Sequence, residues 1–399
     1  SGQLFGEPAI LLRLGWSPLQ IRIGDNDRHR SAGGHLPSSL PCHPDTLRDE
    51  LRRVPEKAWA ELQREGVKAL FDHRLVRGKV YAIDGTGLAP DVRMVSLVCV
   101  SGPRPMLVAW RLLIGDASEK GKEAAVTRSL VEQVLELGGP DAISLLLMDA
   151  LYADGPLLAW LKYVKGIDAL VPVPSDRLIH ADLKDLARAG MVRVLRHRYT
   201  RTIQGHKQSR TVTLISQSGL TSWDSFINSA EGYGGKAPSL WACRVEPESP
   251  TSKDDLPWTL VSTREWPDAA AAFQAFRPRW HIENDAFREL KEGWRLEQQL
   301  WGRDFAMQLA RVTLTCLAFN SAQALLSKSG ASLAARGIRR LNEIYRPQMG
   351  RSPSVIYIGD AYAVLPMEDL LFHLGRTPRQ SLLPLRTRVQ PTPASQHPP

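Results

Sequence analysis

The order of apolar runs along the chain constrains its fold more than any other feature of the sequence. Three of these runs are separated by short turn signals and predict an antiparallel meander of strands over Lys79–Thr86, Val92–Gly102 and Pro105–Gly115. The helix and strand signals that follow alternate, and they cover Lys120–Leu137, Ile143–Asp149, Asp154–Val164 and Ile167–Pro174. A meander followed by alternating helices and strands predicts a layered α/β fold.

The sequence outside this stretch changes in texture, and five regions are expected. Residues 1–75 combine Gly- and Pro-rich loops with an amphipathic helical stretch over Pro44–Leu70, and they start with Ser1 rather than Met, as a truncated N-terminus would. Short β-like pieces with Gly- and Ser-rich turns follow Ser175 and predict a β-rich insertion. The regions are residues 1–75, mostly helical; 76–175 and 256–330, the two parts of the core; 176–255, the insertion; and 331–399, ending in a Pro-rich tail expected to be disordered.

The charge balance favours an anionic partner. The 399 residues carry a net charge of +9 at pH 7, and nucleic acid is the commonest partner of so basic a chain. Most of the basic residues are arginine, however, and the base composition of a genome can produce that bias without any nucleic-acid binding. Hydrophobic residues make up 43% of the chain, which is enough for one large core or several smaller ones.

Cysteine usage and apolar segments indicate a protein of the reducing cytosol. Cys42, Cys99, Cys243 and Cys316 lie far apart and form no CxxC pair, which argues against a zinc ribbon or a disulfide framework. The longest apolar stretches, such as Ile143–Met148, are too short to span a bilayer, and no secretion leader opens the chain. We therefore expect a cytoplasmic protein with no membrane partner.

Three acidic residues occupy unusual sequence contexts. Asp84 ends the apolar run "VYAID", Asp149 ends "SLLLMD", and Glu283 interrupts the segment "FRPRWHIENDAFRELKEGW". Each has an ordinary structural explanation: an Asp-Gly turn for Asp84, a helix cap for Asp149, and an ion pair with Arg279 one turn back for Glu283. Taken together, they lie at strand ends and on an adjoining helix, where open α/β sheets place ligand sites.

The segment Phe276–Trp294 predicts a helix of four or more turns with an acid inside an aromatic stripe. On a helical wheel, Phe276, Leu290 and Trp294 fall within about 20° of Glu283. A carboxylate buried without a strong partner should become neutral, so a charged Glu283 there needs a cation. Two Mg²⁺ ions, or Mn²⁺ as a substitute, would satisfy all three acids at once and support in-line phosphoryl displacement.

These motifs resemble the DDE transposases of the IS4-like group. "AIDGT" and "LLLMDALYADG" are similar to the motifs of the family's two aspartates, and "FRPRWHIENDAFRELK" is similar to its catalytic-helix signature of Tyr, Arg, Glu and Lys. The resemblance covers about Lys79–Leu326. It implies an RNase H-like mixed sheet flanked by helices, with a β-rich insertion between the second Asp and the catalytic Glu.

The resemblance also implies residue roles. Asp84, Asp149 and Glu283 would be metal ligands, and Arg279 would contact a DNA phosphate near the transposon end. Two positions depart from the signature: Phe276 replaces its Tyr, and Leu290 stands where its Lys is expected. Because Lys291 follows one residue later in an otherwise matching "FRELK", a one-residue insertion is expected, and Lys291 would still reach the DNA backbone.

Further DNA contacts are expected outside the three acids. Trp258 is similar to a family Trp that stacks on a flipped base, although most strand tryptophans belong to a core. Arg196, Arg198 and Arg201 lie in a basic segment that is either a solvated hairpin face or a phosphate-binding surface. Arg288, in the helix motif, is expected to bind DNA as well.

The function expected from the resemblance is cut-and-paste transposition. Its DNA partners would be the terminal inverted repeats of the element and the target DNA, with a homodimer on paired ends at the nucleoid. Two alternatives remain open at this point: a catalytically degenerate or domesticated DNA-binding protein with the same fold, and a plain nuclease that cuts without joining.

Overall fold

A computed structural model of the chain shows two compact units, Ser1–Arg53 with Ala331–Pro399, and Val54–Gly330. It describes residues 44–89, 92–114, 123–175, 177–203, 206–248, 257–294, 296, 304–328, 353–358, 361–366 and 390–391. In the first unit the described elements are helix α4 (Pro44–Arg53) and a three-stranded antiparallel sheet of β10 (Pro353–Ile358), β11 (Ala361–Pro366) and β12 (Gln390–Pro391). The expected disordered tail, Cys42 and most of the N-terminal region lie outside the described residues.

The second unit is built on the predicted meander and the alternating segment after it. Strands β1 (Val80–Ala89), β2 (Val92–Cys99) and β3 (Met106–Ile114) pair antiparallel, while β4 (Leu145–Leu147) and β5 (Asp168–Val173) continue the sheet in parallel from β1. The resulting order is β3-β2-β1-β4-β5. The predicted α/β architecture, a mixed sheet flanked by helices, is therefore confirmed and is consistent with an RNase H-like fold.

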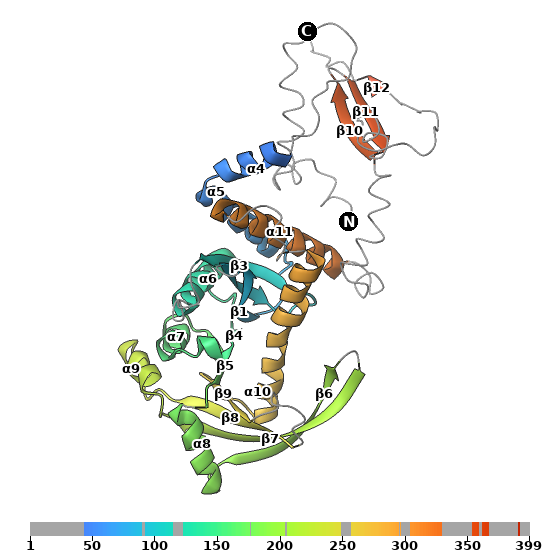
Figure 1. The fold of residues 1–399 in the computed structure, drawn as a ribbon. Helices are drawn as coiled ribbons and strands as arrows, with labels where there is room; N and C mark the ends of the chain where they lie inside the picture. Colours follow the sequence, from blue (N-terminus) through green and yellow to red (C-terminus); the bar gives the residue numbers. More distant parts are fainter. Residues whose placement is uncertain are drawn as a thin grey trace, which may run out of the picture. The chain divides into compact units, whose positions relative to one another are not determined.

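The predicted β-rich segment extends this sheet instead of forming one of its own. Strand β9 (Trp258–Ser262) pairs antiparallel with β5, and β8 (Leu240–Pro247), β7 (His206–Leu220) and β6 (Arg193–Ile203) follow outward to give nine strands. Helices α8 (Leu178–Arg188) and α9 (Asp224–Gly232) connect these strands. The β6–β7 hairpin lies at one end of the sheet (Figure 1).

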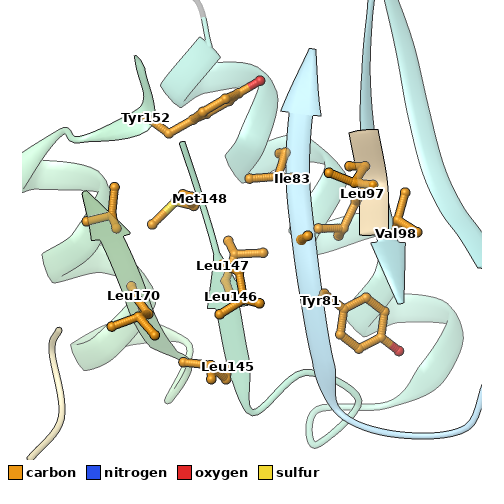
Figure 2. Packing of buried hydrophobic residues seen from close by; sticks show 14 of the residues in the cluster. Tyr81, Ile83, Leu97, Val98, Leu145, Leu146, Leu147, Met148, Tyr152 and Leu170 are labelled. Carbon is orange, nitrogen blue, oxygen red and sulfur yellow. The ribbon is translucent and has the colours of Figure 1, made fainter. Parts of the chain in front are cut away.

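Apolar side chains on both faces of β4 hold the centre of the sheet together. Leu145, Leu146 and Leu147 are all buried, as expected for a parallel strand covered on both faces. Figure 2 shows them between Ile83 of β1 and Leu170 of β5. The covering helices include α6 (Glu123–Gly138) and α7 (Gly155–Ala159), which continues as a π-helical turn to Val164.

The two edges of the nine-stranded sheet differ. At the β3 edge, α5 (Glu56–Asp72) and α11 (Phe305–Lys328) run side by side (Figure 1). The Asn320 amide accepts from Leu107 N at 2.9 Å and donates to Leu107 O at 2.8 Å, while Gln63 Nε2 donates to Trp110 O at 3.1 Å. Side-chain amides thus satisfy backbone groups that an edge strand leaves unpaired. At the other edge, β6 pairs only with β7 among the described strands.

Two predicted helices are interrupted in the structure. The stretch expected over Pro44–Leu70 divides into α4 and α5 at Pro55, because the residue before a proline avoids helical geometry. The helix expected over Phe276–Trp294 is wrong as a single α-helix. Helix α10 (Ala269–Phe276) is followed by a 3₁₀ turn, Arg277–Arg279, around Pro278, and then by two π-helical turns.

None of the described helices combines the length and the apolar character needed to cross a bilayer. Among the described residues, Cys99, Cys243 and Cys316 are buried free thiols.

We predict that Asn320→Leu destabilises the chain by about 2–3 kcal/mol, because both backbone groups of Leu107 lose their partner inside the protein. Urea unfolding of the two forms measures the difference. The matched control is Ser321→Ala, a change on the next residue of α11 that removes a single helix-surface hydrogen bond. Equal midpoints for Asn320→Leu and the wild-type chain would contradict the role assigned to this amide.

Candidate active site

Strand register brings the two aspartates to the same level of the sheet. In the parallel β1–β4 ladder, Ala82 lies opposite Leu147. Asp84 and Asp149 each follow one of these partners by two residues, so the same register continued past the end of β4 places them opposite each other on adjacent strands. Neighbouring strands are about 5 Å apart, and residues two positions apart face the same side. The end of this ladder therefore presents two carboxylates together.

Asp84 is a buried acid within a strand rather than the corner of a turn. Its residue is only 7% exposed, and its Oδ1 accepts from Gly85 N at 2.7 Å. Burial raises the pKa of Asp84 from 3.8 to about 6; the Gly85 hydrogen bond and Arg279 oppose this rise, whereas Glu283 and Asp149 reinforce it. Both other acids therefore lie close enough to act on Asp84 electrostatically.

Asp149 is half-buried at the start of a short 3₁₀ helix, Ala150–Tyr152. Its side chain makes no capping hydrogen bond there, so the helix-cap explanation is not supported. The capping role nearby belongs to Asp154, whose Oδ1 accepts from Leu157 N at 2.7 Å.

Arg279 links Glu283 to Asp84. The guanidinium Nη1 of Arg279 lies 2.7 Å from Glu283 Oε1 and 3.5 Å from Asp84 Oδ2. The Arg279 residue is 7% exposed, whereas the Glu283 side chain is 45% exposed. The structure thus realises the ion pair between Glu283 and Arg279 and extends it to a second acid, which makes Arg279 a buried bridge between them.

The donor set suits a divalent ion, but its present arrangement does not. Carboxylate oxygens are the ligands that Mg²⁺ and Mn²⁺ prefer. Among the described residues, however, no group of three His, Cys, Asp or Glu side chains is placed to hold a metal ion. The Arg279 guanidinium lies between two of the three expected ligands and supplies the positive charge there.

Two π-helical turns contain the segment from Glu283 to the displaced lysine. They span Ile282–Phe287 and Glu289–Gly293, and Trp294 N donates to Glu289 O at 3.1 Å, five residues back. A π-helix pairs residues five apart, so each of its turns holds more residues than an α turn. Lys291 is therefore expected to lie closer to the direction of Glu283 than the roughly 80° that an α-helix would give.

Aromatic side chains join the insertion to the segment that carries Arg279. The Trp258 ring centroid lies 5.7 Å from that of Phe276 and 6.5 Å from that of Phe273. Phe273 in turn packs edge-on against Tyr199 of β6 at 5.1 Å. Trp258 is half-buried, so its ring is part of this packing and also keeps an accessible portion.

Sequence reasoning missed Arg277, which locks the β6 hairpin to the same segment. Its Nη2 donates to Thr200 O at 2.7 Å, and its guanidinium lies 5.4 Å from the Tyr199 ring centroid. The sequence signal for Arg277 was weak. Arg277 lies beside Pro278, in a motif whose family signature assigns a role only to Arg279.

The expected DNA-binding arginines of the insertion point to solvent where they are described. Arg196 Nη2 donates to Glu248 Oε2 at 2.6 Å, so its charge is partly neutralised. Arg198 is exposed, and its Nε donates to Ser209 Oγ at 2.6 Å. Arg288 is also exposed, and the side chain of Arg201 lies outside the described residues.

The chain matches the model of a known protein family. The family model described as "Transposase DDE domain" matches residues 99–321, more than half of the chain. Asp149 and Glu283 lie inside the matched range, and Asp84 lies before its first residue. No curated protein matches the chain.

We predict that the metal-free protein loses stability between about pH 4 and pH 6 through Asp84. Because its folded pKa is about 6 and its ordinary value is 3.8, the folded state binds more protons in this window, and stability falls as pH rises. Asp84→Asn removes this dependence, so its stability relative to the wild-type chain should increase by about 2–3 kcal/mol from pH 4 to pH 7. Chemical unfolding across that range measures it, with the exposed acid change Asp141→Asn as control; parallel curves for Asp84→Asn and wild type would refute it.

Proposed function

Because the chain belongs to the Transposase DDE domain family, we propose that it is a DNA transposase of the IS4-like kind. It would cleave a strand at the transposon end and join the freed 3′-hydroxyl to target DNA. The observation that supports this proposal is that Glu283 and Asp149 both act electrostatically on the buried Asp84 at the end of the β1–β4 ladder. The family generally uses divalent metal ions, which fits a site built from carboxylates.

We assign the acids the role of metal ligands, with Mg²⁺ or Mn²⁺ as the ions and two as their number. When bound, the ions would neutralise charge on the phosphodiester and supply an activated water or 3′-hydroxyl. The chain's own part is to hold the acids in place: β1 and the end of β4 fix the two aspartates, and the π-helical segment packs against β1 to present Glu283. No energy cofactor is needed, because one phosphodiester is exchanged for another.

Basic and aromatic side chains around the acids would position the DNA. Lys291 and Arg288 share the π-helical segment with Glu283 and would contact backbone phosphates, and Arg279 would do so once it leaves the acids. Trp258 would stack on an unpaired base at the transposon end, a contact of roughly 1–3 kcal/mol. Arg196, Arg198 and Arg201 would bind phosphates without reading sequence. A homodimer on paired ends and a cytoplasmic, nucleoid-bound location complete the proposal.

A catalytically silent DNA-binding protein is the second candidate. The bridge of Arg279 between Asp84 and Glu283 favours it, since a permanent bridge would leave no place for a metal. Strand cleavage that rises with added Mg²⁺ or Mn²⁺ distinguishes the transposase. A pre-cut end then distinguishes a transposase from a nuclease, because only the transposase joins that end to a target.

We predict that Asp84→Asn, Asp149→Asn and Glu283→Gln each reduce strand cleavage by more than about a hundredfold, because each removes a charge that organises the phosphodiester exchange. Binding of an end-containing duplex in the absence of divalent ions should stay within about threefold of wild type. Cleavage of a labelled duplex and a gel-shift titration measure the two effects. Asp141→Asn, an acid change outside the site, is the control; near-normal cleavage by any of the three variants would remove that residue from the active site.

We also predict that Arg198→Ala weakens binding to any DNA sequence alike and lowers the slope of log affinity against log salt by roughly 0.9, the loss expected for one phosphate contact. The matched control is Arg188→Ala, which removes an exposed arginine of α8 that pairs with Asp185. Binding is measured between about 50 and 200 mM salt, where the loss of a phosphate contact changes affinity strongly. If the two variants behave alike, the β6 surface is not a phosphate-binding surface.

A further inference from the structure

Arg279 bridges two of the three acids. Its Nη1 contacts Asp84 and Glu283 at 3.5 and 2.7 Å, and the residue is 7% exposed. Its guanidinium also lies 5.7 Å from the Phe276 ring centroid. The buried Asp84 carboxylate and the buried Arg279 guanidinium therefore stabilise each other, while Glu283 meets the same guanidinium from a more exposed position.

This pairing competes with a metal ion for the same carboxylates. An ion of the Mg²⁺ class binds carboxylate oxygens at about 2.0–2.1 Å and repels a guanidinium at hydrogen-bonding distance from them. Glu283 Oε1 and Asp84 Oδ2 both face the Arg279 guanidinium, so an ion that enters between them meets a positive charge at short range. Metal affinity is therefore expected to rise when Arg279 leaves.

Arg279 is also incompletely satisfied where it lies. Its Nε is buried and has no hydrogen-bond partner in the structure. An unpaired buried donor on a charged group costs about 1–3 kcal/mol or more, so the inward position carries an energetic cost. Arg279 ends a 3₁₀ turn and is followed by π-helical turns, so it lies in irregular helix rather than in a regular α-helix. A phosphate could accept from Nε and Nη together.

We propose that Arg279 is an internal counter-ion gate, which occupies the acid cluster in the free protein and competes with the divalent metal until a DNA phosphate draws it out. This inference rests on the proposed function. It adds an order of events: DNA binding at the site promotes metal binding, and metal binding promotes DNA binding by the same factor. A free protein gated in this way holds its metal weakly and cuts little without its DNA.

Metal binding in the absence of DNA tests the gate directly. Mn²⁺ binding is followed by electron paramagnetic resonance for the wild-type chain and for Arg279→Gln, and we expect the variant to bind roughly tenfold more tightly or better, as removal of one competing charge predicts. Arg279→Lys keeps the charge and should stay near wild type. Arg277→Gln makes the same change in net charge two residues away, where the side chain bonds Thr200 O instead of an acid, and should change the affinity by less than about twofold.

Equal or weaker Mn²⁺ binding by Arg279→Gln than by the wild-type chain overturns the gate. Asp84→Asn, introduced into the Arg279→Gln chain as a double variant, shows whether Mn²⁺ binding depends on Asp84. This dependence separates failure of the gate from failure of the proposed function. If Asp84→Asn abolishes the binding but Arg279→Gln does not tighten it, the metal site stands and only the gate is lost. If no variant binds Mn²⁺ in a way that depends on Asp84, the metal-dependent function itself fails, and the gate fails with it.

A variant-free measurement covers the case in which Arg279→Gln does not fold, which circular dichroism would reveal. In the wild-type chain, the Arg279 Nε–Hε resonance should be protected from exchange with water because Nε is buried. Saturating Mg²⁺ should move this resonance and expose it to exchange. A resonance that stays protected while Mg²⁺ occupies the site means that metal and Arg279 coexist, and the gate is excluded.

Discussion

The burial of one carboxylate on β1 determines much of what surrounds it. Asp84 lies in the central part of a nine-stranded sheet with only 7% of its residue exposed, and a charge in that position needs a cation or a proton. The structure uses both solutions: Arg279 approaches to 3.5 Å, and the pKa of Asp84 still rises to about 6 because burial outweighs that help. The site therefore carries too little positive charge to keep Asp84 ionised at its ordinary pKa, and a divalent ion or an arginine can supply that charge.

The mixed sheet explains how acids from three distant parts of the chain meet. The parallel β1–β4 pairing sets Asp84 and Asp149 at one level. The ladder opens with Val80 opposite Leu145, and 64 positions separate Val80 from Ser144, the residue directly before Leu145. The β-rich insertion then carries the chain outward to β6 and back to β9, which pairs with β5. From there, α10 and the irregular turns after it run past β1. One end of this segment packs on the β6–β7 hairpin and the other end packs on α11, and this packing brings Glu283 beside Asp84.

The sequence was sufficient for the parts of this arrangement that depend on local patterns. Apolar runs with short turns located β1 to β3, and an acid directly after an apolar strand singled out Asp84 and Asp149. Helical periodicity also put Glu283 on the same stripe as Phe276 and Leu290, which are buried. Helical periodicity did not predict the breaks in the helix, because a wheel drawn at about 100° per residue assumes a regular α-helix and cannot show the 3₁₀ turn at Pro278 or the π turns that follow. It also failed on Arg279, since the two-acid bridge depends on tertiary contact with β1 and not on spacing along one helix.

Irregular helix geometry and site chemistry are linked in the segment after α10. A regular α-helix would place Lys291 roughly 80° from Glu283, whereas π turns are expected to bring it closer to that direction while leaving Leu290 buried against the core. Such turns are costly unless their surroundings over-determine them, and here aromatic packing from Phe276 and Phe287 supplies that constraint. At the start of the segment, Arg277 ties the β6 hairpin through Thr200 O, two residues from Arg279. The hairpin expected to meet DNA and the guanidinium that bridges the acids are thus both attached to one short 3₁₀ turn, Arg277–Arg279.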